Sequence, residues 1–287
     1  MRAEQITAPV TWHGEGPSWD PVGRQMLVVD MLAGAVVDLS SLEHPARYDV
    51  GSPVAAVIRR RTGGGFIVAT EHGFALFDEG FGLERRLGEV LDDPAIRLNE
   101  GGCDPSGRFF CGSMAYDETP GAGAVYRLEP DGSTAVVLDG VTISNGLQWS
   151  ADGTLAYYVD TPTRRVDVFD YDGSNGSFHG RRPLVTLDAD VPGNPDGMTI
   201  DAEGGLWVAL WGAGEIRRFD PDGILTEVVE VPGVTHTSAA AFGGEALDTL
   251  YVTSSRQHLP EDAEPQAGAV FAVRPGVRGT PLPSFAA

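Results

Sequence analysis

Tight-turn glycines recur along this chain at nearly constant spacing, and each of them precedes a short apolar run. The gaps between successive glycines are about 40 to 51 residues, the span of one four-stranded blade of a β-propeller. Six such turns predict an all-β fold, a six-bladed β-propeller with four-stranded antiparallel blades. The glycines are Gly23, Gly64, Gly107, Gly153, Gly204 and a final pair, Gly243-Gly244.

The residues between these turns have the pattern of β-strands. Runs of four to seven apolar and β-branched residues alternate with turn signals, and no window keeps a helical 3.6-residue stripe for three turns. No Pro/Ser-rich or charged linker divides the chain, so residues 1–287 are predicted to form a single propeller domain. A propeller avoids exposed strand edges by closing its ring, and residues 269–273 and 6–12 are the expected closing pair.

The charge balance narrows the expected partners. Acidic residues outnumber basic ones by 41 to 20, and a net charge of -21 repels phosphate backbones and anionic lipid, so neither nucleic acid nor a membrane is expected. All the basic residues are arginine, which excludes lysine-dependent Schiff-base chemistry and Walker-type phosphate loops. Two cysteines make no disulfide framework, and the start does not resemble a signal peptide. We therefore expect a cytoplasmic protein, a monomer or a small homo-oligomer.

Counting back eight residues from four of the turn glycines leads each time to an oxygen-donor side chain: Glu15, Asn99, Asn145 and Asp196. The innermost strand of each blade lines the central channel, so equivalent positions in successive blades converge on the axis. Two carboxylates and two amide oxygens are suitable ligands for calcium, magnesium or manganese, although zinc also accepts carboxylate. A bound cation would also relieve the repulsion between two partly buried carboxylates.

Each of these residues also has a purely structural interpretation. Asn145 before a glycine is typical of a hairpin turn, and so is Asp196 before Gly197. However, a turn at Asn145 would lie only eight residues before the turn at Gly153, and four repeats share the offset, which together favours a site.

The other blades contribute no ligand in this scheme. The blade of Gly64 offers the apolar Ala56, and in the sixth blade either His236 or Ser238 reaches the axis. Three further histidines and four tryptophans have simpler expected roles, surface or packing for the former and core for the latter: His13, His72 and His258, and Trp12, Trp19, Trp149 and Trp207.

Several motifs make the chain recognisable. In order they are GEGPSW at 14–19, RLNEG at 97–101, DPSGRFF at 104–110, SNGL at 144–147, PDGM at 195–198 and GGLWVA at 204–209. With them the sequence resembles, over essentially its whole length, the SMP-30/gluconolactonase/LRE-like family, which includes regucalcin and bacterial sugar lactonases. The resemblance implies that Glu15, Asn145 and Asp196 bind the metal, that Asp196 is also the general acid/base, and that Arg97 and Asn99 hold the substrate.

One departure concerns a further substrate-contacting glutamate that some members of the family carry. Here Glu118 or Thr119 aligns with it, depending on where the gap is placed. This leaves the identity of the sugar open, because the loop would contact it.

The expected activity is that of a divalent-metal-dependent lactonase, a carboxylic ester hydrolase that opens a sugar lactone to the aldonic acid. Its cofactor would be one divalent cation, Ca²⁺, Zn²⁺, Mg²⁺ or Mn²⁺. Two alternatives use the same site: a phosphotriesterase-like hydrolase, which would need an apolar pocket for its leaving group, and a non-catalytic calcium-binding propeller, which would not need Arg97 and Asn99.

Overall fold

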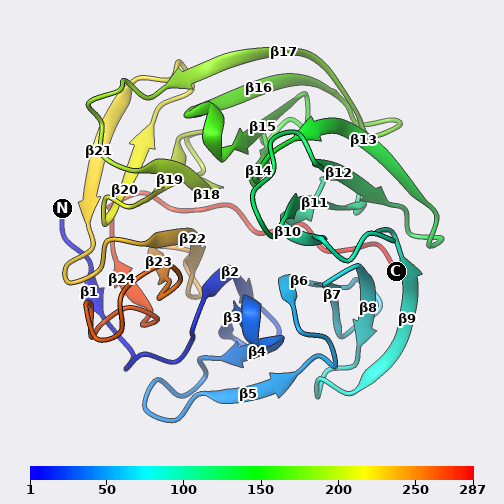
Figure 1. The fold of residues 1–287 in the computed structure, drawn as a ribbon, viewed down its shortest axis with the longest axis horizontal. Coiled ribbons are helices and arrows are strands. Elements are labelled where there is room, and N and C mark those ends of the chain that lie inside the picture. Colours follow the sequence, from blue (N-terminus) through cyan, green and yellow to red (C-terminus); the bar gives the residue numbers. More distant parts are fainter.

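The computed structural model describes residues 1–287 as six four-stranded antiparallel sheets arranged in a ring, a six-bladed β-propeller (Figure 1). The predicted fold class is therefore confirmed. Each blade runs from an inner strand beside the axis to an outer strand at the rim. Helical structure is limited to two single turns, η1 (Met31–Ala33) and η2 (Thr161–Thr163), and no helix has the length and hydrophobicity that crossing a membrane would need.

The strands follow the order of the chain from the axis outward in blades 1 to 5. Blade 1 contains β2 (Gly14–Asp20), β3 (Gln25–Asp30), β4 (Ala35–Asp38) and β5 (Ala46–Asp49), and blade 2 contains β6 (Ala55–Arg60), β7 (Phe66–Thr70), β8 (Gly73–Phe77) and β9 (Leu83–Glu89). Blade 3 contains β10 (Ile96–Cys103), β11 (Phe109–Ala115), β12 (Gly123–Leu128) and β13 (Thr134–Val141). Blade 4 contains β14 (Ser144–Trp149), β15 (Leu155–Asp160), β16 (Arg165–Asp172) and β17 (Ser177–Thr186), and blade 5 contains β18 (Asn194–Ile200), β19 (Leu206–Trp211), β20 (Glu215–Phe219) and β21 (Leu225–Glu230).

Blade 6 closes the ring with strands from both ends of the chain. It contains β22 (Thr237–Gly243), β23 (Thr249–Ser254), β24 (Phe271–Val273) and, at its outer edge, β1 (Glu4–Gln5). The C-terminal strand β24 lies within the predicted closing segment 269–273. The paired N-terminal residues lie just before the predicted segment 6–12, in which Ile6 and Val10 still donate backbone hydrogen bonds to Val270 and Gly268 while the chain turns inward toward β2.

The repeated turns connect the inner two strands of each blade, as the glycine spacing predicts. In blades 2 to 6 the turn glycine has a positive φ, for example +95° at Gly64 and +81° at Gly107, a conformation that glycine adopts without strain. Blade 1 differs, because there the positive φ falls on Arg24, at +55°, instead of Gly23. The carboxylate of Asp20 accepts hydrogen bonds from the backbone N–H groups of Val22 and Gly23 and so supports this turn.

The core lies between the blades, where the faces of neighbouring sheets meet. Of the tryptophans expected there, Trp207 is completely buried and Trp149 nearly so. The expectation is wrong for Trp12, which is half exposed because it precedes the inner strand of blade 1.

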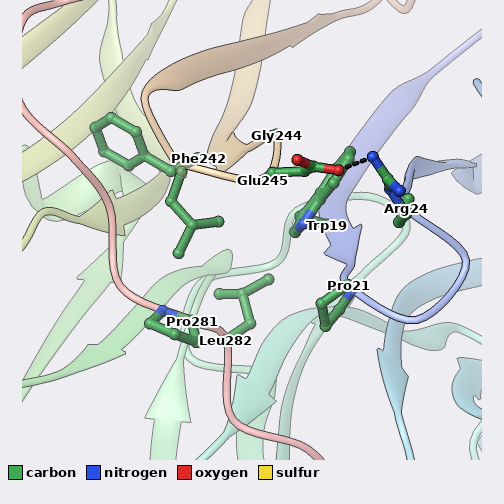
Figure 2. A pocket seen from close by; sticks show the side chains of 9 residues that line it. Trp19, Pro21, Arg24, Phe242, Gly244, Glu245, Pro281 and Leu282 are labelled. Atoms are coloured by element: carbon green, nitrogen blue, oxygen red, sulfur yellow. Dashed lines mark ion pairs between the residues drawn. The ribbon is translucent and has the colours of Figure 1, made fainter.

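The C-terminal segment after β24 crosses one face of the ring, as the red ribbon in Figure 1 shows. Phe285 pairs with Arg61 of blade 2 and buries its ring against Phe109 of blade 3. Beside this segment lies a hollow of about 360 Å³, where Leu282 of the segment meets Trp19 and other residues from the ends of inner strands (Figure 2). Its one ion pair joins Arg24 to Glu245, so the hollow lacks the converging polar groups of a chemical site.

Candidate functional site

A bulge near the start of each inner strand directs the predicted site residues toward the axis. The register shifts between Leu98 and Gly101, between Ser144 and Leu147, and between Pro195 and Met198, so that Asn99, Asn145 and Asp196 each begin a bulge. Glu15 immediately precedes the bulge of β2. Because a bulge re-aims a side chain and interrupts pairing, the four residues converge instead of alternating between faces.

Glycines after these residues let the inner strands approach closely. A Cβ atom at Gly197 would lie 2.6 Å from the Cβ of Ala239 and 2.8 Å from the backbone oxygen of Ser238. At Gly146 it would lie 3.0 Å from the backbone oxygen of Asp196. The pairs Asn145-Gly146 and Asp196-Gly197 are thus strand residues that bring neighbouring blades together, and the hairpin-turn interpretation is wrong.

The convergence forms a cavity of about 210 Å³ on the face opposite the C-terminal segment. All five predicted site residues line it. Nine further residues complete the lining, of which three are hydrophobic: His13, Met114, Glu118, Ile143, Thr161, Asn194, Trp211, Gln257 and His258. The cavity is smaller than the roughly 300–1,000 Å³ typical of sites for drug-sized ligands, so it suits a small and largely polar molecule.

Two carboxylates in this cavity are buried without a cationic partner. Glu15 and Asp196 are 3% and 5% exposed, and neither forms an ion pair. Burial raises the pKa of Glu15 to about 7. Burial, followed by repulsion from Glu15, raises the pKa of Asp196 well above its usual range. A divalent cation between them would remove this electrostatic cost, so the pair fits a metal site.

Asn145 lines the same cavity, and its hydrogen bonds determine the orientation of its amide. Its Nδ2 donates a hydrogen bond of 2.8 Å to Oγ1 of Thr161, whose hydroxyl in turn donates to the backbone oxygen of Pro195. Thr161 therefore accepts the amide hydrogen and fixes the amide orientation, which leaves Oδ1 of Asn145 as the atom available for a cation. No group of three or more His, Cys, Asp and Glu side chains is placed to hold a metal, so the candidate ligand set is two carboxylates and one amide.

Asn99 is not counted among the candidate metal ligands, because its own hydrogen bonds already use both atoms of its amide. Its Oδ1 accepts a hydrogen bond from the guanidinium of Arg97, and its Nδ2 donates to the backbone oxygen of Ser144 at 2.8 Å. The same Nδ2 also donates a long hydrogen bond of 3.4 Å to Oδ1 of Asn145. Asn99 thus links Arg97 to the candidate metal ligands, in agreement with a role on the substrate side.

Arg97 is a buried guanidinium without a carboxylate partner. It is 3% exposed, donates to Asn99 and to the backbone oxygen of Leu98, and lies 5.7 Å above the ring of Tyr116. A buried charge without a partner is costly. Its Nε and Nη2 donate no hydrogen bond within the protein, and because Arg97 lines the cavity, the oxygens of a ligand could satisfy them.

Glu100 is a buried acid that the eight-residue offset does not find. It is 5% exposed and accepts no hydrogen bond, and its Oε2 is completely enclosed. Burial and the negative charge of Glu15 raise the pKa of Glu100 well above its usual range. One sequence signal could have found it. Glycine follows the site residues Asn145 and Asp196, whereas Glu100 stands at the equivalent position after Asn99.

The residues left open by the sequence differ in their surroundings, and of the four only Glu118 lines the cavity. Glu118 lines the cavity, whereas Thr119 hydrogen-bonds Asp117 outside it. The hydroxyl of Ser238 is bonded to the backbone of Gly14 and to Thr253, and His236 stacks on Trp211.

Two histidines line the cavity contrary to their expected surface or packing roles. His13 and His258 belong to its wall, together with Trp211 and Gln257. Burial lowers the pKa of His13 to about 3, so this imidazole is neutral at physiological pH.

Comparisons with known proteins identify the family. The family described as SMP-30/Gluconolactonase/LRE-like region matches residues 13–256. The chain belongs to this family. Regucalcin from Danio rerio, for example, is 36% identical over 279 residues, which cover 95% of this chain and 94% of the relative.

Solved structures of relatives share the architecture. A luciferin-regenerating enzyme matches with a TM-score of 0.91 and 32% identity over 99% of each chain. A regucalcin from Agrobacterium tumefaciens, described as a calcium-binding protein, matches with a TM-score of 0.90 and 29% identity over 100% of this chain and 97% of the other. The family's description supports a lactonase-like propeller.

Proposed function

We propose that the protein is a divalent-metal-dependent hydrolase that opens a sugar lactone to its aldonic acid. The observation that carries this proposal is the pair of buried carboxylates without an ion-pair partner, Glu15 and Asp196, which line a small polar cavity together with Asn145. These three residues would hold the cation. When bound, a cation of this kind supplies Lewis acidity toward a carbonyl oxygen and stabilises negative charge developing there.

Asp196 is the proposed proton carrier. Its carboxylate is buried in the cavity close to Glu15, where it can take a proton from water and return it to the substrate. In the hydrolysis, the Asp196 carboxylate accepts a proton from the attacking water and later returns it to the ring oxygen as the C–O bond breaks. Glu15 has a different proposed role: its negative charge helps to hold the cation, and it takes no part in proton transfer.

Arg97 and Asn99 are the proposed substrate-holding pair. Arg97 lines the cavity, its Nε and Nη2 have no hydrogen-bond partner within the protein, and the bond from Nη1 to Asn99 restrains the guanidinium. A planar guanidinium donates to two neighbouring oxygens at once, as the hydroxyls of a sugar ring provide. The cavity volume of about 210 Å³ limits the substrate to a single small ring.

The alternatives fit the cavity less well. A phosphotriesterase would need an apolar pocket for an aryl leaving group, but only Met114, Ile143 and Trp211 are hydrophobic among the lining residues. A calcium-binding propeller without catalysis would have no use for the buried guanidinium of Arg97. The relative from Agrobacterium tumefaciens is described as calcium-binding, which keeps calcium among the metals to be tested.

A pH-stat screen of aldonolactones, with the chelated protein reloaded with one metal at a time, tests the proposal. We expect acid release above the buffer rate for at least one sugar lactone with at least one of Ca²⁺, Zn²⁺, Mg²⁺ and Mn²⁺. Aryl phosphotriesters serve as the competing substrate class. Hydrolysis of phosphotriesters but not lactones would contradict the proposal, and so would tight metal binding with no hydrolysis at all.

A further inference from the structure

The proposed mechanism leaves three neighbouring aromatic rings unused: His13 and Trp211 line the cavity, and His236 stacks on Trp211. We call the rings of His13, Trp211 and His236 the aromatic wall. Blades 5, 6 and 1 contribute them, because Trp211 ends β19, His236 precedes β22 and His13 precedes β2. Arg97 belongs to blade 3, which stands across the ring from blade 6. The aromatic wall and Arg97 therefore bound the cavity from different sides.

His13 is held firmly in this wall. Its backbone N–H donates to Oδ1 of Asp30 at 3.0 Å, and its backbone pairs with Ser255 of blade 6 in an isolated antiparallel bridge. Its ring nitrogen Nδ1 lies 2.6 Å from Oγ of the same Ser255. Backbone and ring are thus both fixed, and the ring is 4% exposed.

The hydrogen bonds of Ser255 determine which nitrogen of His13 carries the proton. Oγ of Ser255 accepts a hydrogen bond from the backbone N–H of Gln257 at 2.9 Å, and its hydroxyl hydrogen has no acceptor other than Nδ1 of His13. A buried hydroxyl without an acceptor is unfavourable, so Ser255 donates to Nδ1. The imidazole proton is therefore on Nε2, which makes no hydrogen bond within the protein although His13 lines the cavity.

Trp211 adds an apolar surface beside this donor. Its indole stacks on His236 with ring centroids 4.2 Å apart and an interplanar angle of 12°. The ring of His13 meets it edge-on at 5.8 Å. An indole braced by two rings keeps its orientation without a ligand, and it provides a surface for the C–H groups of a sugar ring next to a hydrogen-bond donor.

We infer that the aromatic wall is a second half of the substrate subsite, in which Nε2–H of His13 donates to a ring hydroxyl of the lactone. This inference rests on the proposed function and deepens it. Arg97 and Asn99 would hold one side of the ring, and His13 and Trp211 the other. The wall then makes the site selective for polyhydroxylated lactones over lactones that lack ring hydroxyls.

Two substitutions of His13 separate the cavity donor from the bond to Ser255. His13→Asn places an amide atom near the position of Nδ1 and keeps a partner for Ser255, but it removes the cavity donor. His13→Gln reaches the position of Nε2 and restores an N–H group there. His179→Asn is the matched control, because His179 is exposed on the outer strand β17.

The measurement is kcat and KM for glucono-δ-lactone and for δ-valerolactone, which has no hydroxyl groups. For His13→Asn we expect the KM for glucono-δ-lactone to rise about 3- to 12-fold, the effect of one neutral hydrogen bond. The ratio of kcat/KM for the hydroxylated over the plain lactone should fall by a similar factor. His13→Gln should recover at least half of this loss on a logarithmic scale, which a merely structural role would not produce.

A parallel calorimetric titration with the non-hydrolysable polyol 1,5-anhydroglucitol separates failure of the inference from failure of the proposed function. Lactone hydrolysis with an unchanged KM in His13→Asn overturns the inference alone. Polyol binding that weakens in His13→Asn, in a protein that hydrolyses no lactone, supports the subsite and overturns the reaction. A wild-type protein that neither hydrolyses lactones nor binds the polyol overturns both.

Discussion

Glu15→Gln should make the metal-free protein more stable at pH 8, although it removes a proposed metal ligand. Burial raises the pKa of Glu15 from its ordinary 4.5 to about 7, so the folded state keeps a proton that the unfolded chain releases between these values. Stability contributed by the protonated form is therefore lost as the pH rises through this window. Linkage gives a cost of less than about 1 kcal/mol at pH 5 and about 3 kcal/mol at pH 8.

Glutamine carries no charge and can still accept the backbone hydrogen bond that Gly16 donates to Oε2. Equilibrium urea unfolding of the chelated proteins should therefore find Glu15→Gln about 1 to 3 kcal/mol more stable at pH 8, with a difference near zero at pH 5. Saturating metal should shrink this difference at pH 8, because a ligand at 100 times its Kd contributes about 2.7 kcal/mol to the protein that binds it and less to a variant with a weaker site.

The exposed substitution Glu227→Gln, on the outer strand β21, is the matched control and should show no such pH dependence. A chelated Glu15→Gln protein less stable than wild type at pH 8 would refute the electrostatic reasoning. An equal gain at pH 5 and pH 8 would refute it as well, since the effect would then not come from ionisation.

Three further substitutions test individual roles in the site. Asp196→Asn keeps one oxygen donor but removes the base, so calorimetry should find weakened metal binding, and turnover at saturating metal should fall by about 10²- to 10⁴-fold; full activity would remove Asp196 from the mechanism. Arg97→Lys should raise the lactone KM with little change in the unfolding midpoint, because an ammonium does not donate in parallel to two oxygens; an unchanged KM would take Arg97 out of the substrate site. Thr161→Val leaves Nδ2 of Asn145 without its acceptor and frees the amide to rotate. Metal affinity should therefore fall about 10-fold or more, and excess metal should restore much of the activity. Unaltered affinity would show that Thr161 does not orient the ligand.

The propeller was predictable because its repeat is enforced by backbone geometry. Each inner hairpin needs a left-handed turn residue, and glycine supplies it in five of the six blades, so its spacing counts the blades. The exception at Arg24 is tolerated because the carboxylate of Asp20 satisfies the turn's backbone donors. The exact closing residues were less predictable, because the two-residue strand β1 has no sequence pattern of its own.

The convergence of Glu15, Asn145 and Asp196 on one cavity was predictable for the same reason, since equivalent positions of repeated strands meet at the axis. His13 and Trp211 were missed because strand ends contribute them from outside the shared register. Whether such a residue points inward depends on contacts across blades, such as that of His13 with Ser255, 242 positions away in the sequence. The metal-binding, catalytic and substrate-binding roles proposed for the predicted site residues stay predictions.

The most direct test is the initial rate of acid release from the best sugar lactone as one divalent metal is added stepwise to the chelated protein. We predict a rate at the buffer background without metal, which rises linearly and stops rising at one ion per chain. Chelated Asp196→Asn, titrated alongside, should stay near the background throughout. A full rate in the chelated wild-type protein, or no lactone hydrolysis with any of the four metals, would contradict metal-dependent lactone opening at this site.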